Sequence, residues 1–179
     1  GKSTLLNLIA GFNKPSEGSV LIHNKEVLNP GPDRGVVFQS TNLFPWLNVE
    51  ENISYGLTIK GWGRDKIKNK IEDFIEEVGL ENYKNHYPFE LSGGMQQRVA
   101  LIRTLVNDPE IVLMDEPFGA LDAITRSKMQ DMVRKLWLKG VQTYLTITHD
   151  IVEALILGNR VVVTSSSPGR IIKKYHIDF

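Results

Sequence analysis

The stretch Leu91-Ser92-Gly93-Gly94-Met95-Gln96-Gln97-Arg98 carries the strongest signal for fold and function in this sequence. An apolar stripe at helical spacing starts within it and stops near Asp108-Pro109; its members are Met95, Val99, Ile102 and Val106. A Ser-Gly-Gly opening to an amphipathic helix presents a hydroxyl, free N–H groups and the positive end of the helix dipole. We therefore expect Ser92, Gly93 and Gly94 to bind an anion. The alternative is a Gly-rich loop that Ser92 merely caps.

A second helix start of this kind opens the chain. Gly1-Lys2-Ser3-Thr4, followed by Leu5–Ile9, matches the end of a phosphate-binding P-loop where it enters its helix. Lys2 supplies positive charge for the β- and γ-phosphates of ATP, and the Ser3 hydroxyl can ligate Mg²⁺, which prefers oxygen. The N–H groups of Gly1 to Thr4 face the anion. Two such starts in one chain favour a head-to-tail dimer in which each copy closes the other's site, although GKST alone is short enough for a chance match.

An apolar run that ends in two carboxylates lies between these motifs and the C-terminus. Ile111–Met114 is followed by Asp115, Glu116 and Pro117. At the end of a strand, Asp115 is placed to hold Mg²⁺ through its water shell. Glu116 would face the γ-phosphate and polarise the attacking water as a general base. The alternative is that both carboxylates only cap the next element.

Alternating strand and helix patterns predict an α/β domain with right-handed crossovers. Continuous apolar runs suit strands buried on both faces of a mainly parallel sheet. The runs are Val20–Ile22, Val36–Phe38, Ile111–Met114, Leu145–Ile147 and Val161–Val163. A turn at Ser165–Gly169 is expected between Val161–Thr164 and Ile171–Tyr175. Another helical stripe, which stops near Gly140, comprises Met129, Met132, Val133 and Leu136.

The segment from about Asn48 to Tyr87 is expected to be purely helical. Its clearest stripe starts after Asp65, a candidate N-cap, and stops at Gly79; its members are Ile67, Ile71, Phe74, Ile75 and Val78. We therefore predict one domain over residues 1–179, with an α/β core formed by 1–47 and 88–179 and a helical subdomain at about 48–87. The chain is expected to be truncated at both ends, since the P-loop lacks its first part and no closing helix precedes Phe179.

Composition narrows the function classes. The chain has 179 residues, no cysteine, and 21 basic against 21 acidic residues, so its net charge is zero. Disulfide frameworks and thiolate metal sites are excluded, and no long-range field attracts nucleic acid, so no nucleic-acid partner is expected. No signal peptide and no apolar run of about 20 residues is found. A membrane role must therefore work through a partner subunit.

Three further motifs appear in a fixed order with those above. They are Gln39 after Val36–Phe38, Phe118-Gly119-Ala120-Leu121-Asp122 after the two carboxylates, and Thr148-His149-Asp150 after Tyr144–Ile147. Together these motifs resemble those of the ATP-binding subunits of ATP-binding-cassette (ABC) transporters, from Gly1 to about Ile172. Leu91–Arg98 resembles the signature motif of that family, with Met95 at the position where Gln is commoner. The resemblance implies a P-loop NTPase fold of the ABC ATPase type.

The resemblance also implies roles for single residues and for partners. Gln39 would sense Mg²⁺ and the membrane subunit, His149 would contact the γ-phosphate, and Asp122 would link the two sites of a dimer. A solvated loop residue is the alternative for Gln39, and a structural histidine at a strand end is the alternative for His149. The implied partners are a second ATP-binding subunit, either identical or a close paralogue, transmembrane permease subunits and, indirectly, an extracellular or periplasmic solute-binding protein. The implied location is the cytoplasmic face of the membrane.

A narrower resemblance concerns the importers of nitrate, sulfonate, taurine and similar small solutes. It rests on Gly31–Gln39, Leu43–Leu47 and Ser167–Ile171. Phe44 and Trp46 follow Gln39, where the membrane subunit docks in that family, so they are expected either to anchor that interface or to belong to the core. The function expected is ATP hydrolysis coupled to uptake, with this chain alone inactive. The alternatives are a soluble ABC ATPase without a transport role and a non-enzymatic fragment.

Overall fold

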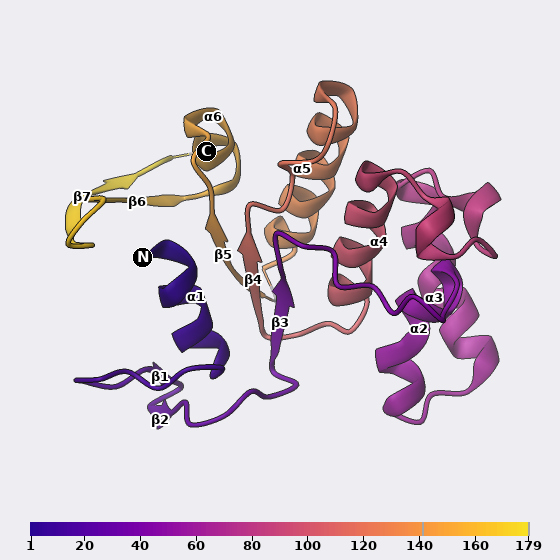
Figure 1. Cartoon of the computed structure of the whole chain (residues 1–179), viewed down its shortest axis with the longest axis horizontal. Coiled ribbons are helices and arrows are strands. Elements are labelled where there is room, and N and C mark those ends of the chain that lie inside the picture. Colours follow the sequence, from indigo (N-terminus) through magenta and orange to yellow (C-terminus); the bar gives the residue numbers. More distant parts are fainter. Residues whose placement is uncertain (141, 179) are drawn as a thin grey trace.

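A three-stranded parallel sheet lies at the centre of the computed structural model, which describes residues 1–140 and 142–178. Its strands are β3 (Arg34–Val37), β4 (Ile111–Asp115) and β5 (Thr143–Ile147), in the order β3-β4-β5 (Figure 1). The registers pair Val37 with Met114 and Asp115 with Ile147, so the three strands end at the same edge. The α/β class and the parallel sheet are thus confirmed. Val141 and Phe179 belong to the predicted domain but lie outside the described residues.

Helices cover both faces of this sheet. The first helix, α1 (Lys2–Ala10), packs on one face, where Leu6 and Ala10 meet Leu113 and Ile147. On the other face lie α4 (Gly93–Leu105) and α5 (Ala123–Leu138), while α6 (Ile151–Leu157) contacts α5 (Figure 1). Successive β4 side chains point to opposite faces, so Leu113 joins one cluster and its neighbours Val112 and Met114 join the other.

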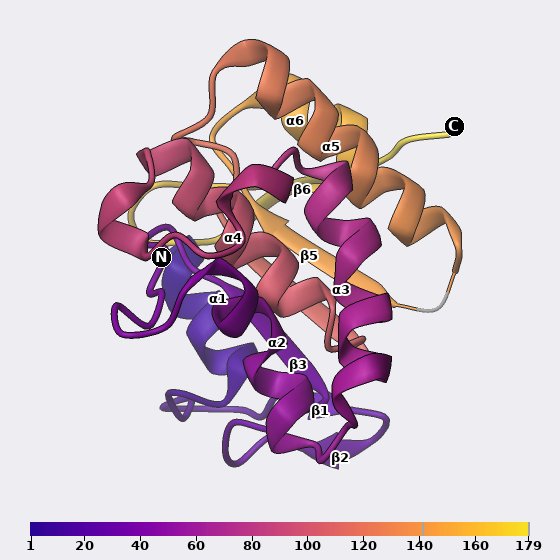
Figure 2. The same ribbon diagram turned by 90° about the vertical axis from the view of Figure 1, so that its right-hand side faces the viewer.

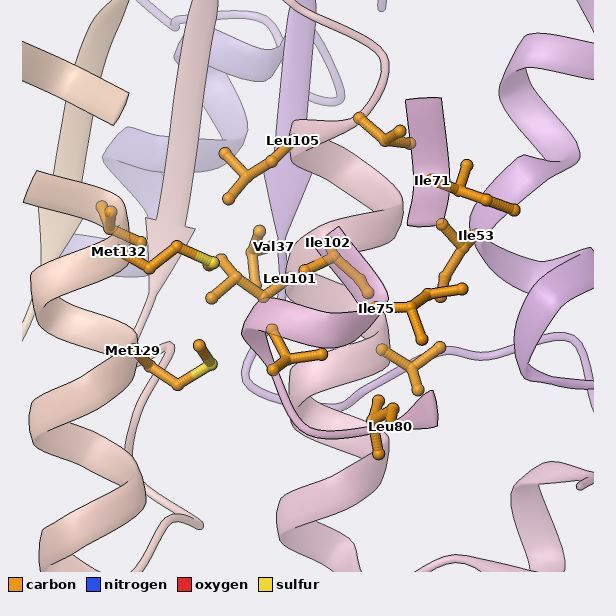
Figure 3. Close-up of a cluster of buried hydrophobic side chains, with 14 of the residues drawn as sticks. Val37, Ile53, Ile71, Ile75, Leu80, Leu101, Ile102, Leu105, Met129 and Met132 are labelled. Carbon is orange, nitrogen blue, oxygen red and sulfur yellow. The ribbon is translucent and has the colours of Figure 1, made fainter. Parts of the chain in front are cut away.

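The segment predicted to be helical, from about Asn48 to Tyr87, lies between β3 and β4 and contains helices and no strand among its described residues. It contains α2 (Val49–Ile59), α3 (Arg64–Glu77) and the 3₁₀ turn η1 (Glu81–Tyr83), and a second 3₁₀ turn, η2 (Pro88–Glu90), follows it. Helix α2 packs on both α3 and α4 (Figure 2). Figure 3 shows Ile71 and Ile75 of the predicted stripe facing Ile53 and Ile102. The stop at Gly79 is confirmed by its φ of +66°. The expected N-cap at Asp65 is wrong, because Gly63 is the N-cap and Asp65 lies in the first turn, where its charge still favours the helix dipole.

Two apolar runs do not form buried parallel strands, and that part of the prediction is wrong. Val20–Ile22 contributes to β1 (Leu21–Ile22), which pairs antiparallel with β2 (Lys25–Glu26) through a tight turn. Val161–Val163 lies in β6 (Arg160–Thr164), which pairs antiparallel with β7 (Ile171–His176). Short connections let each strand pair with its sequence neighbour, and Val162 and Val163 stay exposed. The predicted turn at Ser165–Gly169 joins β6 to β7.

No helix within residues 1–140 and 142–178 combines the length and apolar character that crossing a membrane requires.

Candidate functional site

The carboxyl ends of the three parallel strands bring together three predicted site residues. Gln39 follows β3, Glu116 follows β4 and His149 follows β5. Glu116 lies between the other two: its Oε1 is 3.0 Å from His149 Nδ1, and its Oε2 accepts a hydrogen bond from Gln39 Nε2 at 3.5 Å. Ligands of open α/β sheets bind at this edge. Residues separated by up to 110 positions in the chain thus form one cluster around a single carboxylate.

The backbone of Glu116 has an unusual conformation. Its φ is +48°, in the left-handed region that β-carbon-bearing residues seldom adopt, and Pro117 follows it. The Glu116 N–H donates to Ile147 O at 2.9 Å and so continues the ladder between β4 and β5 by one residue. Such a conformation costs on the order of 1–3 kcal/mol and persists only where surrounding structure imposes it. A strained residue at the general-base candidate is a signal that sequence alone does not contain.

The start of α1 lies beside the loop that carries His149. Lys2 Nζ donates to Thr148 O at 3.0 Å, although the two residues are 146 positions apart. Gly1 is the N-cap of α1 and makes no side-chain cap, and Gly1 to Thr4 are exposed. The first N–H groups of α1 therefore face outward with no side chain to satisfy them, which is the arrangement that binds phosphate at a helix N-terminus.

The second predicted anion site starts α4 and has different neighbours. Ser92 is the N-cap of α4, and its Oγ accepts from Met95 N at 3.3 Å. A β-carbon on Gly93 would meet no atom within 4 Å, and one on Gly94 would lie 3.5 Å from both Ala120 O and Leu121 Cδ2. The nearest neighbours of Gly94 are thus in the Phe118–Asp122 loop. Lys2, in contrast, contacts the loop of Thr148.

Asp122 ends that loop and begins α5. Its Oδ1 accepts from Thr125 N at 3.0 Å and from Ile124 N at 3.1 Å, so it is the N-cap of the helix. Hydrogen bonds from Thr125, and then from Ile124, lower the pKa of the Asp122 carboxyl. Arg126, one turn later, donates to Leu121 O at 2.9 Å and fixes the loop from the other side.

A cleft of about 100 Å³ opens beside the Glu116 cluster. Its lining includes residues that the sequence analysis singled out and others that it missed: Glu116, Phe118, Gly119, Arg126, Thr148, His149, Asp150 and Glu153. Arg126 and Glu153 are the charged residues that were missed. Glu153 leaves a trace in the sequence, because it is the only charged residue in the apolar helix Ile151–Leu157.

The side chains predicted to hold Mg²⁺ suit that ion. Ser3 starts α1, Asp115 ends β4 and Gln39 follows β3, and each offers oxygen. In the described part of the chain no three His, Cys, Asp or Glu side chains gather into a metal-binding group. Mg²⁺ does not need one, since it is commonly held by one or two carboxylates together with waters and substrate phosphates. A hydroxyl, one carboxylate and an amide oxygen fit such an ion.

An aromatic patch follows Gln39 in the chain. It consists of Phe44, Trp46 and Tyr55, whose ring centroids lie 5.6 Å (Phe44–Trp46) and 4.7 Å (Phe44–Tyr55) apart. The buried side chain of Asn52 holds this loop, because it accepts from Phe44 N and donates to Phe44 O and Leu47 O. Trp46 is 70% exposed and Phe44 is half-buried. Of the two expectations for Trp46, the core is therefore excluded.

Comparison with known proteins shows the family of the chain. A family model described as ABC transporter matches residues 1–119. Over all 179 residues the chain is 49% identical to the taurine import ATP-binding protein TauB of Pelagibacter ubique and covers 68% of that protein. It is 52% identical over 178 residues to the uncharacterized ABC transporter ATP-binding protein MJ0412 of Methanocaldococcus jannaschii, covering 99% of this chain and 67% of that protein. The chain thus spans about two thirds of the length of these relatives.

A solved structure extends the agreement to three dimensions. The dimeric structure of a post-hydrolysis state of the ATP-binding cassette MJ0796, bound to ADP and Pi, superposes with a TM-score of 0.88 at 34% identity. The match covers 100% of this chain and 82% of that one. The predicted fold class therefore agrees with that of the solved structure. The chain belongs to the ABC transporter family, as one of its ATP-binding subunits, whose hydrolysis of ATP is coupled to transport.

Proposed function

We propose that this chain powers an importer of taurine or of a related small solute such as another sulfonate or nitrate. The observation that carries the ATPase assignment is the convergence of Lys2, Gln39, Glu116 and His149 at one edge of the parallel sheet. Import and the solute class are inferred from the relatives, several of which are named taurine import proteins.

Each residue of this cluster has a proposed role in hydrolysis. Lys2 and the N–H groups at the start of α1, from Gly1 to Thr4, bind the β- and γ-phosphates. Ser3, Asp115 and Gln39 would hold Mg²⁺, which would neutralise charge on the phosphate oxygens. Glu116 orients a water in line with the γ-phosphate and accepts its proton.

His149 acts beside this base. It is 73% exposed and hydrogen-bonds Glu116 through Nδ1, so its other ring nitrogen is free to reach the γ-phosphate. The Glu116–His149 contact orients both side chains before substrate binds. Fixed groups of this kind stabilise the charge that develops in the transition state without reorganising during the reaction.

The second anion-binding loop is proposed to act across a dimer. Gly94 lies against Ala120 and Leu121, so Ser92–Gly94 and the Phe118–Asp122 loop form one surface. In a head-to-tail pair, this surface of one copy would cover the ATP on α1 of the other. Asp122, whose Oδ1 is engaged as the cap of α5, would link the two sites.

The exposed aromatic patch is the proposed docking surface for a membrane partner. Phe44 and Trp46 are proposed to dock a transmembrane permease at the cytoplasmic face of the membrane, and the permease in turn receives solute from an extracellular or periplasmic binding protein. Residues 48–87 are proposed to form a helical subdomain that carries motion from the nucleotide to this interface.

Residues 1–179 expressed alone are proposed to bind ATP weakly, a point that calorimetric titration against the natural-length protein tests.

Reconstitution tests the proposed function. The natural-length protein would be co-purified with its permease, placed in liposomes and supplied with binding protein and ATP. ATP hydrolysis should rise with taurine or the related solute and should stop in Glu116→Gln. Hydrolysis indifferent to the permease and to every solute of this class would point to an ABC ATPase without a transport role. Absence of ATP binding by the natural-length protein would point to a non-enzymatic chain.

A further inference from the structure

Glu153 is a buried carboxylate on α6, four residues after His149. Its side chain lines the same cleft as Glu116 and His149, and the residue is 5% exposed. Its Oε1 is fully enclosed and has no hydrogen-bond partner among the residues that the structure describes. Ionisable groups are rarely buried without full pairing, because their desolvation is unfavourable. An under-satisfied carboxylate at this position therefore requires an explanation.

The surroundings of Glu153 come from two segments, helix α5 and the loop that precedes α6. Thr148, which precedes the helix, and Arg126, in the first turn of α5, line the cleft together with Glu153. Burial raises the pKa of Glu153, and the charge of Asp150 adds to the rise, while Thr148, Arg126 and Gln130 act in the opposite direction.

Two of these residues, Arg126 and Thr148, are tied to site loops. Arg126 donates to Leu121 O at 2.9 Å and so holds the Phe118–Asp122 loop. On the other side, Thr148 O accepts from Lys2 Nζ, and Thr148 Oγ1 accepts from Asp150 N at 3.0 Å. Glu153 thus lies where the loop that carries His149 meets the loop that faces a second copy.

We propose that Glu153 is a positioning residue that holds the Thr148–Asp150 loop against the Phe118–Asp122 loop, through Thr148 on one side and Arg126 on the other. It sets the direction of His149 toward Glu116 and couples that direction to the dimer-facing loop. The role rests on the proposed function, because it has value only if His149 and Glu116 serve hydrolysis.

If this role is correct, Glu153→Gln should lower ATPase activity without lowering the stability of the fold. Glu153→Gln keeps the shape and an acceptor for Thr148 but removes the charge that Arg126 faces. A neutral amide is easier to bury than a carboxylate with an unpaired oxygen, so the fold should not suffer. A residue that only supports the fold would show no activity loss with this conservative change.

The experiment uses the natural-length protein in complex with its permease. Glu153→Gln should leave the melting temperature unchanged or higher and the Kd for ATP within about twofold, while kcat falls by about tenfold, the pattern of a lost transition-state interaction. Glu153→Ala should be less active than Glu153→Gln, because it removes the acceptor as well. Asp131→Asn, an exposed carboxylate-to-amide change on α5, is the matched control and should behave as wild type.

A double-mutant cycle completes the test. Arg126→Met should also lower kcat, and adding Glu153→Gln to it should cause no further loss, since both changes break one link. Wild-type kcat in Glu153→Gln, independent multiplicative losses in the cycle, or a fall in melting temperature together with weaker ATP binding would each overturn the proposal. Glu116→Gln in the same assay distinguishes failure of the proposed function from failure of the Glu153 proposal. If Glu116→Gln remains active, the proposed hydrolytic site is wrong, whatever the effect of Glu153→Gln.

Discussion

Replacing Trp46 with alanine measures whether the aromatic patch is an interface. Because Trp46 is 70% exposed, it hides roughly 75 Å² in the free chain, worth at most about 2 kcal/mol at about 25 cal/mol per Å². A fully buried aromatic residue of the core would cost about 3–5 kcal/mol on the same change. Phe118, which is 1% exposed, supplies that reference in the same protein.

Two measurements on the natural-length protein decide the point. In chemical denaturation, Trp46→Ala should lose no more than about 2 kcal/mol and clearly less than Phe118→Ala. In binding to the permease held in nanodiscs, Trp46→Ala should raise Kd by roughly 30-fold, as expected for an interface anchor worth about 2 kcal/mol. Tyr175→Ala on β7, a partly exposed aromatic on a separate hairpin, should leave that Kd unchanged. Unaltered permease binding by Trp46→Ala, or a stability loss equal to that of Phe118→Ala, would refute the docking surface.

Three further outcomes are expected. Glu116→Gln should lower ATP hydrolysis by a factor on the order of 10²–10⁴ while ATP binding persists, and near-normal turnover would rule out Glu116 as the base. Homodimers of Lys2→Ala and of Gly94→Asp should each be nearly inactive. Mixing the two variants should restore hydrolysis, because one composite site of the mixed dimer is intact. If mixed dimers that carry both substitutions on one chain are as active as those that carry them on separate chains, Ser92–Gly94 does not act in trans. Burial, with the charge of Asp108, raises the pKa of Tyr144 to about 12. The contribution of the protonated Tyr144 phenol to folding stability is therefore fully present below its unfolded-state pKa, near 10, and is lost as pH rises through about 12. In an ultraviolet titration, the phenolate signal that appears near this high pH should vanish in Tyr144→Phe.

The structure indicates that the Gly94→Asp variant should fold normally. A β-carbon at Gly94 meets its neighbours only at ordinary contact distance, and a carboxylate in the first turn of α4 favours the helix dipole. The variant should therefore fold, and its inactivity would report on the site and not on the fold. A melting temperature equal to that of the wild type is the check.

Local sequence determined much of this protein. Helical stripes such as Ile67, Ile71 and Ile75 have a 3.6-residue period that is readable without the fold, and Gly79 and Gly140 mark the ends of their helices. The order of the motifs from Gly1 to Asp150 indicated the family, because several short motifs in one order are far more specific than any of them alone.

Only the tertiary structure decided the rest, because it depends on contacts between distant residues. Apolar runs look alike whether they pair in parallel across the sheet or fold back as hairpins, so Val161–Val163 was misassigned. The positive φ of Glu116, the Lys2 contact with Thr148 and the exposure of Trp46 arise where separate elements meet. Glu153 shows the limit most clearly. A lone carboxylate in an apolar helix is visible in the sequence, but its burial between two site loops exists only once α5 and α6 have packed together.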